Sequence, residues 1–193
     1  MNVKEALNKS AIFQKVGACA DEMGLDTYVV GGFVRDLLLK RESKDIDFVC
    51  VGSGIDLAKK VASTFEHHVP LSVFKNFGTA MITVDDWELE FVGARKESYI
   101  KESRKPLVED GTLQEDLERR DFTINAMAVS INARNFGDLH DPFKGMKDIQ
   151  RKVIKTPQAA DTTFSDDPLR MMRAVRFASQ LQFDIDADTF EGI

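Results

Sequence analysis

The sequence lacks several features that would place it in a specialised class of protein. It has two cysteines, Cys19 and Cys50, without C-x-x-C spacing or a nearby histidine, which excludes a disulfide framework and a cysteine zinc site. We expect both to be reduced and buried. No run of about 18 apolar residues is present to span a bilayer, so a cytoplasmic location without membrane contact is expected. The 26 basic residues do not outnumber the 32 acidic ones, so any nucleic-acid contact must be local or supplied elsewhere.

What the sequence does contain is enough apolar material for a folded domain. Its 193 residues are 43% apolar, which suits one catalytic domain of ordinary size and the beginning of another element. The sequence stops at Ile193 in what are expected to be the first turns of a helix, with no capping signal, so we expect it to be part of a longer protein. The oligomeric state stays open.

Hydrophobic spacing predicts alternating helices and strands. Helices are expected at residues 2–23, 33–39, 55–65, 166–181, from about 122 and from 187, and strands at 28–30, 46–51, 69–74, 79–84, 87–92 and 127–131. The charged segment 94–117 predicts a long mobile loop, and 157–165 predicts a connector.

Two aspartates flank an apolar residue at the start of one expected strand. Because side chains alternate along a strand, Asp45 and Asp47 point to the same side. Such a pair of hard oxygen ligands suits Mg²⁺, which binds carboxylate and phosphate oxygens. Glu90 would complete a metal-binding triad if its strand lies beside that of Asp45. D-x-D pairs also occur on exposed strand edges, so a surface role is the alternative.

A glycine pair lies between an expected strand and an expected helix. The bare backbone N–H groups of Gly31 and Gly32 can face a phosphate at such a turn. Arg35 follows closely and adds a positive charge. Asp36 could equally pair with Arg35 and hold it in place, which is a structural role.

A second basic cluster precedes the helix expected from Phe122. The plain interpretation makes Asp121 the N-cap of that helix. A cap does not explain Arg119 and Arg120, which would lie near the positive end of the helix dipole. We therefore expect an anionic ligand at these arginines.

A third cluster recurs every three residues along the helix expected at 166–181. Asp167, Arg170, Arg173 and Arg176 form one slowly winding stripe. One interpretation is an ion-paired solvent face, in which an i,i+3 pair contributes a few tenths of a kcal/mol. The other uses Asp167 and Arg170 as a planar edge that accepts from an exocyclic amine and donates to ring acceptors, while the later arginines hold a triphosphate.

Six segments, in this order and spacing, carry a resemblance to a known family. GGFVRD, KDIDFV, ELEFVGARKESY, EDLERRDFTINAMA, HDPFKG and DDPLRMMRAVRFASQL resemble the bacterial class II tRNA nucleotidyltransferase and poly(A) polymerase family, most closely its Bacteroidetes-type members with a C-terminal HD domain. The resemblance implies an α+β fold, in which a polymerase-β-like head with a mixed sheet flanked by helices spans residues 1–155. The first helices of an all-α neck are implied at residues 156–193.

The resemblance also implies roles for individual residues. Asp45 and Asp47 match the Mg²⁺ ligands, with Glu90 as a further catalytic candidate. The nucleotide-binding candidates are Gly31, Gly32, Arg35, Arg119, Arg120, Asp121, Asn125, Asp167, Arg170, Arg173 and Arg176. Asp166 stands where glutamate is commoner in the family's base-reading motif.

The implied function is template-independent addition of CCA to the 3′ end of tRNA from CTP and ATP. Residues 94–117 coincide with the family's flexible loop, implicated in switching from CTP to ATP, which favours full CCA addition. The family grips tRNA mainly with regions that would lie beyond residue 193. A poly(A) polymerase using ATP is the alternative, and a small-molecule nucleotidyltransferase is a remote one.

The sequence also contains a His-Asp dipeptide, which an HD phosphohydrolase uses to bind metal. His140 and Asp141 precede a proline and have no other histidine at useful spacing. We therefore expect them to form a structural turn.

Overall fold

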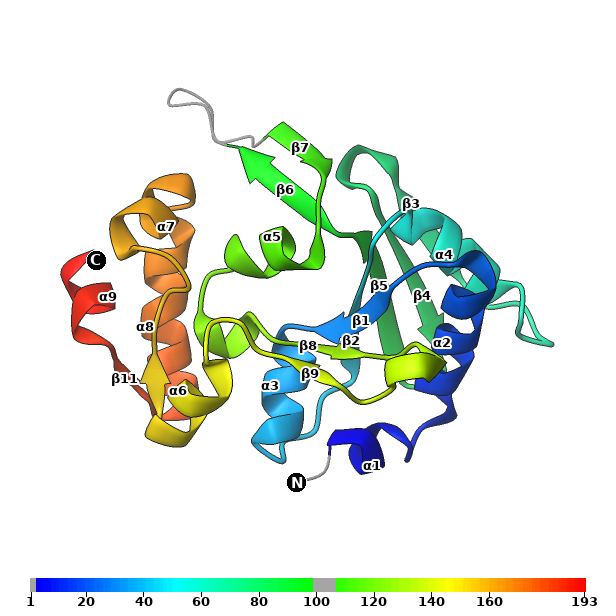
Figure 1. Cartoon of the computed structure of the whole chain (residues 1–193), viewed down its shortest axis with the longest axis horizontal. Coiled ribbons are helices and arrows are strands. Elements are labelled where there is room, and N and C mark those ends of the chain that lie inside the picture. The colour runs from blue at the N-terminus through cyan, green and yellow to red at the C-terminus, as the bar shows by residue number, and fades with distance from the viewer. Residues whose placement is uncertain (1–2, 99–106) are drawn as a thin grey trace.

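The computed structural model describes residues 3–98 and 107–193, and within these ranges a seven-stranded mixed sheet organises the chain (Figure 1). The strand order is β3-β4-β5-β2-β1-β8-β9, in which β2 and β5 run parallel and the other neighbours run antiparallel. The strands of this sheet are β1 (Thr27–Val30), β2 (Asp45–Cys50), β3 (Leu71–Phe74), β4 (Thr79–Val84), β5 (Trp87–Gly93), β8 (Ala128–Ser130) and β9 (Leu139–His140). This arrangement confirms the predicted mixed sheet.

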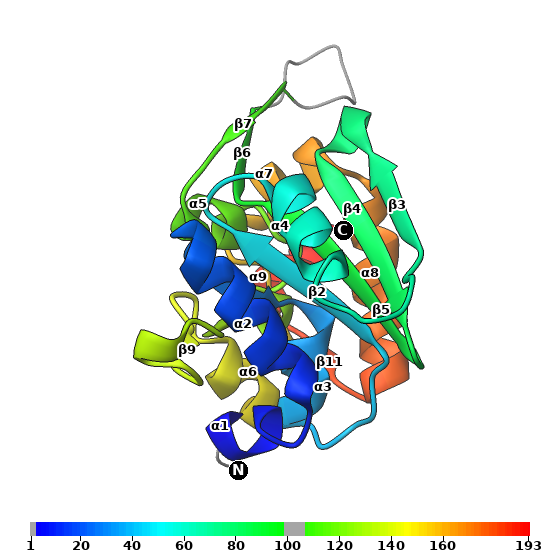
Figure 2. The ribbon, with the colours of Figure 1, turned by 90° about the vertical axis from the view of Figure 1, so that its right-hand side faces the viewer.

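Helices cover the two faces of the sheet unequally. Figure 2 shows α2 (Ala11–Met23) and α4 (Gly54–Ala62) in front of the sheet and α8 (Leu169–Leu181) behind it. The remaining helices are α1 (Val3–Leu7), α3 (Gly32–Leu38), α5 (Leu113–Glu118), α6 (Gly145–Arg151), α7 (Ala160–Asp166) and α9 (Ala187–Glu191). Residues of β2 and β5 on the face toward α8 line the cleft described below.

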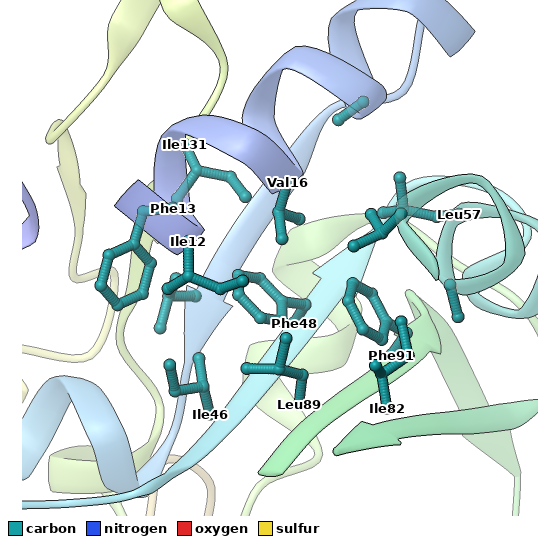
Figure 3. Close-up of a cluster of buried hydrophobic side chains, with 14 of the residues drawn as sticks. Ile12, Phe13, Val16, Ile46, Phe48, Leu57, Ile82, Leu89, Phe91 and Ile131 are labelled. Atoms are coloured by element: carbon teal, nitrogen blue, oxygen red, sulfur yellow. The ribbon is translucent and has the colours of Figure 1, made fainter. Parts of the chain in front are cut away.

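The main hydrophobic core lies under α2 and α4. Alternate residues of the central strands point into it, and the rings of Phe48 and Phe91 stack with centroids 5.0 Å apart (Figure 3). Val16 of α2 and Leu57 of α4 close the core from the helix side. Burying one face of β2 in this way forces the intervening residues, which include Asp47, onto the opposite face.

A second core joins the C-terminal helices to the sheet domain. Phe122 and Ile124 pack with Phe164 of α7 and Phe177 of α8, and the rings of Phe122 and Phe177 meet edge to face at 5.9 Å. The parallel pair β10 (Val153–Ile154) and β11 (Asp184–Ile185) ties this region together. The boundary expected at residue 155 stays a prediction, since this core draws residues from both sides of it.

Two expected helices are wrong. The helix expected at residues 2–23 is broken, because Ser10 has an extended backbone and its hydroxyl accepts the N–H of Ile12, which starts α2 afresh. The helix expected from Phe122 is a single 3₁₀ turn, Thr123–Asn125. There the N–H of Thr123 donates to the carbonyl of Lys155, 2.8 Å away, instead of continuing a helix.

Two segments expected to be irregular contain regular structure. The expected loop at 94–117 holds the antiparallel pair β6 (Arg95–Ser98) and β7 (Leu107–Asp110), followed by α5. Thr112 and Glu115 form a capping box that starts α5. The rest of that loop, residues 99–106, lies outside the described residues. The expected connector at 157–165 contains most of α7, and the helix expected from residue 166 begins at Leu169.

The expectations for the two cysteines and for Asp141 are confirmed. Cys19 and Cys50 are free and buried. Asp141 forms the predicted turn, since its carboxylate accepts the N–H groups of Gly145 and Met146 at 2.6 and 3.0 Å. His140, expected in the same turn, is instead the last residue of β9 and pairs with Ala128. Within the described residues, the helices are too short or too polar to cross a bilayer.

Candidate active site

The predicted carboxylates lie together on the face of the sheet toward α8. In the parallel pairing of β2 with β5, Asp47 is in register with Glu90 and Asp45 with Glu88. Residues in register point the same way, so all four side chains emerge on one face. The condition set for Glu90, that its strand neighbours that of Asp45, is therefore met.

The electrostatics of these carboxylates favour a cation. Burial raises the pKa of Asp47, which the charge of Asp45 raises further while that of Arg120 lowers it. Burial and the charge of Asp47 likewise raise the pKa of Glu90. A divalent ion would relieve this crowding of negative charge.

The donor set fits a metal that shares its ligands with a substrate. Within residues 3–98 and 107–193, no three His, Cys, Asp or Glu side chains converge closely enough to hold a metal ion by themselves. Mg²⁺ commonly binds through one or two carboxylates and completes its shell with phosphate oxygens and water. Asp45 and Asp47 can supply the carboxylates, and the role of Glu90 as a third ligand stays a prediction.

The glycine turn forms a gap beside the carboxylates. Gly31 has φ 71° and ψ −135°, a conformation that residues with a side chain rarely adopt. A β-carbon placed there would lie 3.0 Å from Nη1 of Arg120 and 3.3 Å from Oδ2 of Asp47. The missing side chain therefore leaves a space between a guanidinium and a carboxylate, which a metal-bound phosphate oxygen could fill.

Arg35 is held by a network of polar side chains. Its Nε and Nη2 donate to both carboxylate oxygens of Asp36, at 3.0 and 2.8 Å, and its Nη1 donates to Asn125 at 2.8 Å. Asn125 in turn donates to Asp121 at 3.0 Å. The structural role considered for Asp36 is thus present. Asp36 also fixes the Arg35 guanidinium at the edge of the cleft described below.

The expectation that Arg119 and Arg120 lie near the start of a helix is wrong. They follow the end of α5, where positive charge complements the helix dipole, and both pair with the buried carboxylate of Asp116. Asp121 caps no helix. Its Oδ1 accepts the N–H of Phe122, and its Oδ2 accepts Nε of Arg173 at 2.7 Å.

The three arginines of the stripe lie on α8 and, with Asp167 just before that helix, they line one cleft. Arg170 is only 8% exposed, and its Nε lies 3.9 Å from Oδ2 of Asp167. Arg173 and Arg176 lie over the ring of Phe177, 5.2 and 5.0 Å from its centroid. The interpretation of this stripe as an ion-paired surface is therefore wrong for Arg170.

One cleft of about 1660 Å³ brings the predicted residues together. Its lining residues come from β2 and β5 on one side and from α8 on the other. Figure 1 shows these elements apart, with α8 on the left and the strands on the right. Every basic side chain lining it within the described residues is an arginine: Arg35, Arg95, Arg119, Arg120, Arg170, Arg173 and Arg176. Guanidinium groups bind phosphate through two parallel N–H donors, so the lining suits a polyphosphate.

All the predicted site residues line this cleft, and sequence reasoning missed several others. Arg95 lines it from the start of β6, and Phe177 lines it beneath three guanidinium groups. Asp116 does not line the cleft but pairs with Arg119 and Arg120, which do. The spacing of Asp116 to Arg119 and Arg120, three and four residues, could have revealed that contact. No sequence signal distinguishes Arg95 or Phe177.

The sequence matches a known protein family and individual proteins that process tRNA. The sequence profile of the family described as "Poly A polymerase head domain" matches residues 27–155. An A-adding tRNA nucleotidyltransferase of Aquifex aeolicus (strain VF5) is 46% identical over 165 residues, 86% of this chain and 20% of that protein. A CCA-adding enzyme of Bacillus pumilus (strain SAFR-032) is 42% identical over 174 residues, 89% of this chain and 41% of that protein.

A solved structure is also similar. A tRNA nucleotidyltransferase complexed with a primer tRNA and an incoming ATP analogue superposes with a TM-score of 0.79 at 44% identity, covering 92% of this chain and 48% of that one. The chain thus spans between a fifth and a half of the length of these relatives.

Proposed function

The chain belongs to the family of the poly A polymerase head domain, and on this basis we propose that it adds CCA to the 3′ end of tRNA from CTP and ATP without a nucleic-acid template. One observation carries the proposal. The carboxylate pair of β2 and the buried Arg170 with its neighbour Asp167 line the same arginine-rich cleft. The first provides for phosphoryl chemistry, and the second provides for choosing the base.

The reaction proposed is attack of the RNA 3′-hydroxyl on the α-phosphorus of the nucleotide. A new P–O bond forms, the bond to the β-phosphate breaks, pyrophosphate leaves and the hydroxyl proton is released. Asp45 and Asp47 would hold Mg²⁺, which when bound supplies a Lewis acid for the triphosphate and the attacking oxygen. Arg120 and Arg173 would orient the phosphates and offset the charge that develops on pyrophosphate.

The base would be selected by Asp167 and Arg170. Cytosine and adenine both present an exocyclic amine, which donates, beside ring nitrogens that accept. Uracil and guanine present a carbonyl oxygen where that amine would be. A carboxylate that accepts and a guanidinium that donates therefore match CTP and ATP and leave UTP and GTP poorly paired.

Arg170→Ala tests this assignment. We expect the preference for CTP over UTP, measured as the ratio of kcat/KM, to fall by about tenfold or more, because one charge-assisted donor is lost. The control is Arg176→Ala, which removes an exposed arginine of the same helix. It should lower kcat/KM for CTP and for UTP by the same factor. Unchanged discrimination in Arg170→Ala would contradict a base-reading role.

The product on tRNA tests the function itself. With tRNA ending before CCA, the full-length protein should incorporate CTP twice and then ATP once. The relatives of this chain include both A-adding and CCA-adding enzymes, so addition of A alone is a second product to look for. Addition of ATP only to tRNA that already ends in CC would assign A-adding activity. Unlimited ATP addition to general RNA would indicate a poly(A) polymerase, and incorporation of neither nucleotide would refute the proposal.

The remaining expectations stay predictions: the HD domain and the tRNA-gripping regions beyond residue 193, the favouring of CCA addition by segment 94–117, and the cytoplasmic location.

A further inference from the structure

We propose that Asp116 is a positioning residue for nucleotide binding, which sets Arg119 and Arg120 so that Arg120 faces the phosphate position beside Asp47. This inference deepens the proposed function and rests on it. Asp116 does not itself line the cleft. It would act through the two arginines that do.

Asp116 is bonded to both arginines by the same edge of each guanidinium. Its Oδ1 accepts Nε and Nη2 of Arg119, at 3.1 and 2.5 Å. Its Oδ2 accepts Nε and Nη2 of Arg120, at 3.2 and 2.9 Å. Each carboxylate oxygen therefore fixes the plane of one guanidinium.

This geometry decides where the other edge of Arg120 points. With Nε and Nη2 committed to Asp116, Nη1 lies over Gly31, 3.0 Å from where a β-carbon would be. Oδ2 of Asp47 borders the same empty position at 3.3 Å. A phosphate oxygen in that space would meet a donor from Arg120 and a metal held by Asp47. Rotation of the Arg120 guanidinium would remove that donor.

Burial of the Asp116 carboxylate costs free energy, so its presence calls for an explanation. Asp116 is fully buried, and removing a carboxylate from water opposes its ionisation. Burial alone would raise the pKa of Asp116, but the two guanidinium groups outweigh it and hold the pKa below its usual value. The Asp116 carboxylate is therefore ionised and pairs with two guanidinium cations.

A purely structural role for Asp116 explains less. Surface pairs at i,i+3 or i,i+4 contribute a few tenths of a kcal/mol to a helix, and arginines at the end of α5 are already favoured by its dipole. Neither effect requires a buried carboxylate. An acid that orients two arginines on the side facing the cleft accounts for both the burial and the shared geometry.

Asp116→Asn, measured on the full-length protein, tests the proposal. The asparagine keeps the shape but offers an N–H₂ group to one of the arginines, so their guanidinium planes are released. We expect KM for ATP and for CTP to rise together by about tenfold, the loss of one charge-assisted hydrogen bond, with a smaller change in kcat. The increase in melting temperature caused by ATP in EDTA, which requires neither metal nor RNA, should shrink in parallel.

Two further variants separate positioning from folding. Asp148→Asn alters another buried aspartate, which accepts the hydroxyl of Thr123 at 2.7 Å away from the arginine pair. It should lower the melting temperature without raising KM. Asp116→Glu keeps the charge, so the protein should fold even if Asp116→Asn does not, yet its longer arm should still raise KM.

The outcomes distinguish this inference from the proposed function. A normal ATP-dependent melting shift and normal KM in the folded Asp116 variants would overturn the positioning role alone. If the wild-type protein added no nucleotide to RNA but its ATP shift was lost in Asp116→Asn, the proposed function would fail while the positioning role stood. An equal rise of KM in Asp148→Asn would show a general folding effect and overturn the inference.

Discussion

Replacing Asp47 by asparagine is expected to lower kcat for nucleotide addition by about 10³-fold, which corresponds to about 4 kcal/mol of activation free energy. Asp47 lies next to the other groups proposed to bind the metal and the phosphates. It lies in register with Glu90, and it borders the gap above Gly31. Asparagine has nearly the same shape but no negative charge, so it should hold a divalent cation poorly. Steady-state incorporation of CTP and ATP into tRNA measures the effect.

A binding measurement shows whether the loss arises at the metal. Asp47→Asn should keep the melting shift caused by ATP in EDTA and lose the additional shift caused by Mg²⁺. Asp56→Asn is the matched control, since Asp56 is an exposed aspartate paired with Lys59 on α4, across the sheet from the cleft. It should retain wild-type kcat. Addition by Asp47→Asn at more than a tenth of the wild-type rate would refute the assignment of the metal site.

Gly31→Ala is expected to reduce nucleotide addition by about 10²-fold, because a displacement of about 1 Å among reacting groups has an effect of that size. The new methyl group would occupy the space between Arg120 and Asp47, where 3.0 and 3.3 Å separate its position from the two side chains. The backbone conformation at Gly31 adds a strain of about 1–3 kcal/mol. KM and kcat for ATP and CTP measure the first effect, and thermal unfolding measures the second.

Gly24→Ala separates strain from crowding. Gly24 also has positive φ, 65°, but a β-carbon there meets nothing within 4 Å. This control should lower the melting temperature by a few degrees, since about 1 kcal/mol corresponds to roughly 2–4 °C in a domain of this size. Its nucleotide addition should stay normal. Equal activities in the two alanine variants would show that the gap above Gly31 has no role.

The parts of the fold that follow hydrophobic alternation could be predicted from the sequence. The pattern D-I-D-F-V-C places Ile46 and Phe48 in the core, which leaves Asp45 and Asp47 on the opposite face whatever the neighbouring strands are. Glu90 needed one more fact, the adjacency of β2 and β5, because alternation gives the face of a strand but not its neighbour.

The predicted helix boundaries are wrong where a short polar capping signal interrupts the hydrophobic spacing. Ser10 starts a new helix inside a continuous apolar pattern, and the capping box of Thr112 and Glu115 starts α5 inside a charged segment. Both signals were readable from the sequence. The 3₁₀ turn at Thr123 was not, since its N–H bonds to Lys155, a partner distant in the chain. Tertiary hydrogen bonds of that kind override local propensity.

The candidate site was predictable residue by residue but not as a network. The arginines stand out by charge and spacing, so all of them were found except Arg95. Two of their partners, Asp116 and Phe177, are missing from the prediction. The spacing of Asp116 allows its contact with Arg119 and Arg120, but only the structure shows that Asp116 and Phe177 are buried. The direction in which each guanidinium points therefore required the structure.

The parallel pairing of β2 with β5 also has a bearing on how the molecule reaches its native state. Asp47 and Glu90 are distant in sequence and lie in register only through this pair, and Arg170 joins them from farther still along the chain. Closing such long segments slows folding relative to local helix formation. Secondary structure should therefore appear early during refolding, whereas the capacity to bind a nucleotide should arise only with the last long-range contacts.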